Sequence, residues 1–183
     1  MQKNQLARLR ICKINLIKRF KKMYVDFDTL KDSSRIWVYQ SSREFTEEEM
    51  GIMSSKLTDF VNEWTRHGDD LKASFSIKHK HFIVLAVDES FNQVSGCSID
   101  ASTHVFKSFE NEFKLELLNK LNTAFKDGEH INVVSLSDFQ KYVKADKIHA
   151  DTLVFNNMVQ NKGDLDQIWE VPANMSWHSR YFN

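Results

Sequence analysis

Apolar side chains mark two segments as interior strands of a sheet. Arg35–Gln40 and Phe82–Val87 carry apolar or aromatic residues at successive positions, which is the pattern of strands that are buried on both faces. Residues 73–77 instead alternate apolar side chains with Ser74 and Ser76, as in a strand with one wet face. We predict that the first two strands are central and that the third lies at an edge.

Two segments carry the period of amphipathic helices. The first starts with Thr46 as N-cap and Glu49 three residues later, a capping box, and its period is predicted to close at His67 and Gly68. The second follows the Phe82–Val87 strand, and its apolar spacing continues to Leu121. The helices therefore follow the first and third predicted strands along the chain.

A turn signal at Asp127 and Gly128 predicts a hairpin, or a loop, that leads to a last strand over residues 131–136. The order strand, helix, strand, strand, helix, strand is that of a ferredoxin-like α+β sandwich, in which strands one and three are central. We therefore expect a ferredoxin-like α+β core over residues 23–136, with residues 137–183 as a small C-terminal accessory unit packed on it.

The sequence of the accessory unit, residues 137–183, predicts three short elements and an aromatic tail. Residues 137–143 should form a capped helix, residues 151–155 an extended piece and residues 163–168 a brief helix. Residues 169–182 are aromatic and not solvating. Such a tail should pack on the open face of the sheet or on a partner subunit, and the second alternative predicts a homodimer.

Charge separates the first 22 residues from the rest of the chain. They hold eight Lys or Arg and no acid, which leaves 17 bases and 25 acids in the remainder. The acidic body argues against nucleic acid as a partner, because phosphate contacts need clustered bases. The head lacks the apolar core of a secretory signal. It is either a basic amphipathic helix for an anionic partner or membrane surface, or an upstream stretch that is not native. The change of composition at Met23 favours the second reading.

The two cysteines, Cys12 and Cys97, are 85 positions apart and match no disulfide or metal spacing. This predicts a reduced, cytoplasmic protein, and the hydropathy pattern predicts no transmembrane segment. His79 and His81 form an H-x-H pair that could hold a metal. No third ligand has a recognisable spacing, so we assign neither a metal nor a cofactor.

The strand-to-helix junction around Cys97 is the main candidate site. Gly96 permits a tight turn, and Ser98 or Asp100 can act as N-cap, so the thiol would lie at a helix N-terminus, where backbone N–H groups favour thiolate. His104 would lie about 10 Å further along the helix, which is too far for an ion pair with Cys97. A base for the thiol must therefore come from elsewhere in the fold.

Three interpretations of Cys97 remain open: a small buried residue that closes the turn, a nucleophile or redox sensor, or the neighbour of a backbone that binds a ligand. Asp88 and Glu89 end the central strand, where ordinary solvation also explains them. The candidate ligand-binding residues combine these acids with the junction: Asp88, Glu89, Gly96, Cys97, Ser98, Asp100 and His104.

Six blocks, residues 35–41, 44–46, 87–90, 95–100, 124–128 and 152–157, resemble those of a small family of uncharacterised bacterial proteins. Some members of that family carry the label "ABC transporter ATPase". The resemblance covers about residues 23–182, implies Met23 as the natural start and supplies no catalytic residue. The chain has no Walker A loop, no G-x-G-x-x-G, no G-x-S-x-G and no H-E-x-x-H.

The sequence thus predicts a binding or regulatory module without evident catalysis, whose partner is a small molecule or a protein. A thiol-dependent enzyme or redox sensor that uses Cys97 is the alternative function. The ATPase activity that the label implies is the weakest alternative, because its phosphate-binding loop is missing.

Overall fold

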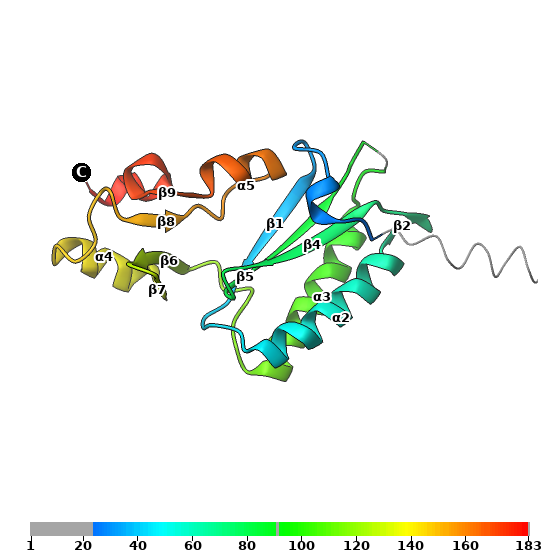
Figure 1. Ribbon diagram of the computed structural model, residues 1–183, viewed down its shortest axis with the longest axis horizontal. Helices are drawn as coiled ribbons and strands as arrows, with labels where there is room; N and C mark the ends of the chain where they lie inside the picture. The colour runs from blue at the N-terminus through cyan, green and yellow to red at the C-terminus, as the bar shows by residue number, and fades with distance from the viewer. Residues whose placement is uncertain (1–23, 91, 183) are drawn as a thin grey trace, which may run out of the picture.

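The computed structural model describes residues 24–90 and 92–182. It is an α+β protein, as the sequence predicts, with two larger antiparallel sheets, a two-stranded ribbon and four α-helices among the described residues (Figure 1). The basic head lies outside the described residues, so the predictions made for it are not tested. No helix in the described part of the chain is both long and apolar enough to cross a membrane.

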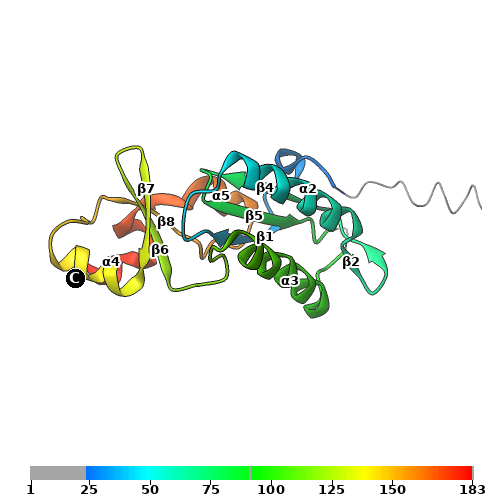
Figure 2. The same ribbon diagram turned by 90° about the horizontal axis from the view of Figure 1, so that it is seen from below.

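The helices and 3-10 turns comprise η1 (Phe27–Thr29), α2 (Glu47–Glu63), α3 (Gly96–Phe113), α4 (Leu136–Lys144), α5 (Lys162–Ile168), η2 (Ala173–Met175) and η3 (Trp177–Tyr181). The strands are β1 (Arg35–Gln40), β2 (Thr65–Arg66), β3 (Asp69–Asp70), β4 (Ala73–Lys78), β5 (Phe82–Val87), β6 (Asn122–Asp127), β7 (His130–Ser135), β8 (Leu153–Phe155) and β9 (Glu170–Pro172). Figure 2 shows the same elements from a second direction.

The first sheet has the strand order β1-β5-β4, so β5 is central and β4 lies at an edge, as predicted. Strand β1 was also predicted to be central, but it lies at the other edge of this sheet. Every residue of β5 is buried. The other side of β1 is partly covered by a later segment: the Ile36 N–H donates to the Gln160 carbonyl (3.0 Å), and the Lys162 N–H donates to the Ser34 carbonyl (2.9 Å). Residues 160–162 therefore lie beside β1.

The predicted fourth strand lies elsewhere. Gly128 has a positive φ of 59° at the first turn position, which suits a two-residue hairpin between β6 and β7. This hairpin belongs to a second sheet with the order β7-β6-β8-β9. The strand order therefore does not confirm the ferredoxin-like topology. A tight hairpin keeps both its strands in one sheet, and here that sheet is the second one.

Both long helices end earlier than expected; α2 starts at the predicted N-cap, whereas α3 starts at Gly96, before the predicted N-cap positions Ser98 and Asp100. Thr46 and Glu49 form the predicted capping box of α2, yet the helix ends at Glu63, and His67 and Gly68 form the turn of the small β2-β3 ribbon instead. Likewise α3 ends at Phe113, well before Leu121.

A left-handed residue and a side-chain cap explain the early end of α3. Lys114 has φ 52° and ψ 49°, a conformation that ends helices. The Glu110 carboxylate then accepts the backbone N–H groups of Leu117 (2.8 Å) and Leu118 (2.9 Å), so these residues turn away from the helix axis. The apolar residues beyond Phe113 therefore keep a helical spacing in the sequence but do not lie in a helix.

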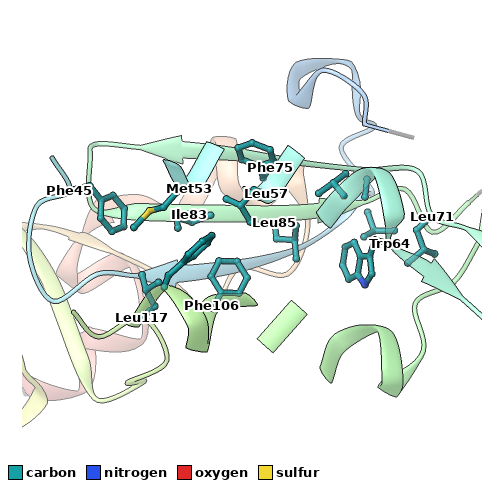
Figure 3. Close-up of a cluster of buried hydrophobic side chains, with 14 of the residues drawn as sticks. Phe45, Met53, Leu57, Trp64, Leu71, Phe75, Ile83, Leu85, Phe106 and Leu117 are labelled. Carbon is teal, nitrogen blue, oxygen red and sulfur yellow. The ribbon is translucent and has the colours of Figure 1, made fainter. Parts of the chain in front are cut away.

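Three apolar clusters hold the layers together. The largest lies between the first sheet and helices α2 and α3, and Figure 3 shows its side chains, including Met53, Leu85 and Phe106. The second covers the opposite face of this sheet, where Leu165 and Trp169 pack. The third joins the second sheet to α4.

The position of the tail is now defined. Trp169 packs on the open face of the first sheet, in the second cluster, whereas Tyr181 and Phe182 pack against the third cluster. Trp169 is buried, whereas Tyr181 and Phe182 are partly buried, so Trp169 takes the first of the two predicted positions, the open face of the sheet. His178 is fully buried in the same region.

Candidate functional site

The junction predicted as a site is the first turn of α3. Its N-cap is Ser95, whose hydroxyl accepts the Ser98 N–H (3.3 Å), and not Ser98 or Asp100. Cys97 is exposed, so its interpretation as a small buried residue is wrong. Within the described ranges, no hydrogen bond or ion pair to the Cys97 sulfur is found. The thiol is therefore accessible, and the described residues place no activating partner at its sulfur.

The other residues of this junction have structural roles or face solvent. Ser98 is 3% exposed. Its hydroxyl donates to the Thr65 carbonyl (2.9 Å), and its own carbonyl accepts the Trp64 indole N–H (2.8 Å). These bonds fasten the start of α3 to the end of α2. Asp100 and His104 are exposed on the helix surface, as is Gly96 at its start.

The two acids are also engaged within the chain. Asp88 is 3% exposed, and its carboxylate accepts the Ser90 hydroxyl (2.5 Å) and the Lys72 ammonium (3.2 Å). Burial alone would raise the pKa of Asp88, but these hydrogen bonds outweigh burial and hold the pKa below its ordinary value. Glu89 accepts the Val94 N–H (3.2 Å). Both acids thus organise the loop after β5 and do not converge with Cys97.

A groove lies near the other end of α3, beside β7. It consists of two adjoining pockets of about 390 Å³ and 470 Å³, which share Ser42 and Val133. The other lining residues belong to the loop after β1, the turn between β4 and β5, the C-terminal end of α3, and the β6-β7 hairpin: Arg43, Glu44, His79, His81, Glu110, Lys114, Leu115, Glu116, Asn122, Glu129, His130, Ile131, Asn132, Val134 and Ser135. We call it the β7 groove.

The groove and the cysteine are far apart. Phe113, the last residue of α3, lies 16 positions after Cys97. At a rise of 1.5 Å per residue, this is about 24 Å along the helix axis. The β7 groove is therefore a site distinct from the junction that the sequence favours. Of the residues singled out in the sequence, it contains only His79 and His81.

Strand β7 lines the groove over its whole length, and within the described part of the chain one side of its backbone has no strand partner. Leu136 donates to the Leu121 carbonyl (2.7 Å), which fixes the register: residues 130, 132 and 134 bond to β6. The N–H and C=O groups of Ile131 and Val133 therefore point to the free edge. In the part of the chain that the structure describes, no hydrogen bond to these groups is found.

An ion pair shapes the wall opposite β7. The Arg43 guanidinium makes two hydrogen bonds to the Glu49 carboxylate (2.6 and 2.9 Å) and one to the Phe113 carbonyl (2.7 Å). The bonds from Arg43, together with those from Thr46, lower the pKa of Glu49 to about 2. These bonds hold the loop after β1 against the start of α2 and the end of α3.

The histidines of the groove do not form a metal centre. His79 Nε2 lies 3.2 Å from Glu170 Oε2, whereas His81 Nδ1 lies 2.9 Å from the His79 carbonyl oxygen. Burial lowers the pKa of His79, although the Glu170 carboxylate acts in the opposite direction. No group of three or more side chains of the metal-binding types converges among residues 24–90 and 92–182.

Sequence reasoning missed the groove because its walls come from four separate segments. One local signal of an open strand edge was present. Strand β7 has the sequence HINVVS and contains none of the proline, lysine or acidic residues that protect exposed strand edges. Comparison with protein-family models, with curated proteins and with solved structures finds no match to this chain.

Proposed function

We propose that this chain is a non-catalytic binding module and that its binding site is the β7 groove. The observation that carries the proposal is the edge of β7, where the N–H and C=O groups of Ile131 and Val133 face the groove and have no hydrogen-bonding partner among residues 24–90 and 92–182. Binding sites are typically concave and present a few fixed polar groups. Pockets of about 390 Å³ and 470 Å³ are within the usual size for such sites.

Electrostatics supports binding more than catalysis in this groove. Arg43 is neutralised by Glu49, and His79 has a lowered pKa and a carboxylate neighbour. A general acid or base needs a proton-transfer partner in reach of a substrate, and a nucleophile needs an adjacent base. The groove offers backbone groups and fixed charges, which are the features of recognition sites.

A titration of the ¹⁵N-labelled protein with a mixture of small-molecule fragments tests this function. Because bound fragments should occupy the concave surface of the groove, we expect the largest amide shifts at residues 129–135 and 42–44. The matched variant Val133→Asp should abolish these shifts, while Asp59→Asn, an exposed site on α2, should leave them unchanged. Shifts confined to residues 95–100 would instead favour the Cys97 junction and contradict the proposal.

Thiol chemistry at Cys97 is the second candidate function, and the exposure of its sulfur is the observation that favours it. The side chains that could have activated the thiol, Asp88 and Glu89, are bonded elsewhere. Loss of a measured turnover or of peroxide consumption in Cys97→Ala, with the fold intact, would establish this function. The third candidate, the ATPase activity implied by the family label, would require ATP binding by calorimetry.

Two broader predictions fit this proposal. A cytoplasmic location is supported by the spacing of the two cysteines, which matches no disulfide framework. A relation to ferredoxin-like sandwiches is supported by the β1-α2-β4-β5-α3 order and by the pairing of residues 160–162 beside β1, where such a fold places its last strand.

A further inference from the structure

We propose that the occupant of the β7 groove is a basic, extended polypeptide segment that adds to the second sheet as a fifth strand beside β7. This inference rests on the function proposed above and specifies its ligand. Extended peptides bind exposed sheet edges through main-chain hydrogen bonds, and pockets along the edge select their side chains. The β7 groove combines such an edge with pockets at both ends.

The backbone of β7 determines which residues of the added segment can form hydrogen bonds to it. Ile131 and Val133 each direct one N–H and one C=O to the free edge. A strand added there would lie about 4.8 Å from β7, inside the groove. Every second residue of the segment would exchange a pair of hydrogen bonds with one of these two residues. Its side chains would alternate between the two faces of the second sheet.

The opposite wall favours a single strand over a folded partner. Ser42 ties this wall together, because its N–H donates to the Glu116 carbonyl (3.0 Å) and its hydroxyl accepts the Glu116 N–H (3.0 Å). Ser42 and Val133 line the groove together. A second copy of the chain would bring its own wall with its β7, and the two walls would meet in the groove. An extended segment avoids this conflict.

The charges on the walls indicate a basic segment. Four carboxylates line the two pockets, those of Glu44, Glu110, Glu116 and Glu129. The cations among the lining residues are Arg43 and Lys114, and the charge of Arg43 is already compensated by Glu49. Glu44 lies 3.9 Å from the Lys80 ammonium, and the other three carboxylates still outnumber Lys114, so the carboxylates and cations of the walls sum to a net negative charge. Lysine or arginine side chains in the segment would complement them.

Synthetic peptides test the inference on the full chain. The probe is an acetylated and amidated octapeptide of alternating Lys and Val, and binding is measured by amide shifts and by calorimetry. We expect shifts at residues 129–135. A matched peptide that is N-methylated on alternate residues, so that it cannot donate to β7, should bind at least tenfold more weakly. A peptide with Glu in place of Lys should also bind at least tenfold more weakly. Equal binding of all three would overturn the inference.

Variants of the chain test separately how the β7 backbone and the wall charges contribute to peptide binding. Val133→Pro removes an edge-facing N–H that β6 does not use, and proline is tolerated at such positions. We expect at least a tenfold loss of peptide binding. Glu129→Lys should weaken binding about two- to fivefold at low salt, whereas Asp59→Lys, with the same net charge, should not. If Val133→Pro does not fold, the N-methylated peptide still decides the question.

The outcomes distinguish this inference from the function on which it rests. Fragments that shift residues 129–135 without any binding of the basic peptide would overturn the fifth strand but leave the groove as a binding site. Peptide shifts confined to other surfaces would overturn the fifth strand, and fragment shifts confined to other surfaces would overturn both proposals. A mass that doubles with concentration in sedimentation, together with protection of the Ile131 and Val133 amides, would assign the edge to a second copy and overturn the inference.

Discussion

At the scale of single residues, Cys97 shows how burial decides a chemical role. The same turn sequence suits a buried residue or an exposed thiol, and the structure exposes the sulfur. We predict that a maleimide labels Cys97 in the native protein as fast as in a denatured control, to within about threefold, and that labelling leaves the fold unchanged by circular dichroism. Mass spectrometry of the Cys12→Ser variant assigns the label, and slow labelling would contradict the exposed position.

Burial has a strong electrostatic effect on His178. Its side chain is fully buried, Nδ1 lies 2.7 Å from the Ser176 hydroxyl, and Nε2 has no partner in the described chain. Burial, helped by the charge of Arg180, lowers its pKa from 6.5 to about 4. The folded protein therefore resists protonation of this imidazole, while the unfolded chain does not.

This shift predicts a loss of stability in acid. Because the folded pKa is lower, the contribution is complete above pH 6.5 and is lost as the pH falls from 6.5 towards 4. The full loss is about 3 kcal/mol, at 1.36 kcal/mol for each pKa unit. Urea unfolding of the wild type and of His178→Phe between pH 7 and pH 4 measures it. Equal pH dependence in the two proteins would show that His178 does not contribute.

At the scale of elements, the local signals of α2 were sufficient to place its start. The Thr46 hydroxyl accepts the Glu49 N–H (3.2 Å), and the Glu49 carboxylate accepts the Thr46 N–H (2.9 Å). Thr46→Ala should lower the free energy of unfolding by about 1 kcal/mol, as loss of an N-cap typically does. Lys107→Ala, an exposed position on α3, is the control and should stay within about 0.5 kcal/mol. Chemical denaturation distinguishes the two.

The end of α3 could not be located in the same way. Its apolar spacing continues beyond Phe113, and no glycine or proline marks the end. The helix stops because Lys114 adopts a left-handed conformation and Glu110 takes over two backbone N–H groups. Both interactions depend on how the following loop returns to the second sheet. The periodic pattern therefore cannot locate the end of α3, because it depends on side-chain polarity and not on the path of the chain after the helix.

At the scale of the whole molecule, Trp169 connects the two sheets. Its ring packs on Phe82 of the first sheet and on Phe155 of the second, with centroid distances of 5.0 and 5.1 Å. Its indole N–H donates to Asn157 (3.0 Å), which in turn donates to Gln40 (2.7 Å). The first sheet is thus covered on its second face by a side chain from the C-terminal segment.

Removing this ring should uncouple the layers. Trp169→Ala should cost about 3 to 5 kcal/mol of unfolding free energy, the usual range for a buried aromatic residue. Trp169→Phe keeps most of the packing and should cost less, with about 1 kcal/mol due to the lost hydrogen bond. Thermal and urea unfolding give both values. A cost below 1 kcal/mol for Trp169→Ala would show that the sheets are held together by other contacts.

The sequence by itself determined the elements whose causes are local. It placed β1, β4, β5 and the start of α2, because alternation, apolar runs and capping boxes act over a few residues. Only the tertiary structure decided which strands share a sheet, since strand pairing joins residues far apart in the chain: residues 160–162 lie beside β1, and β7 pairs in the second sheet. The groove was hidden from the sequence for the same reason. Its free edge exists because the β6-β7 hairpin does not join the first sheet.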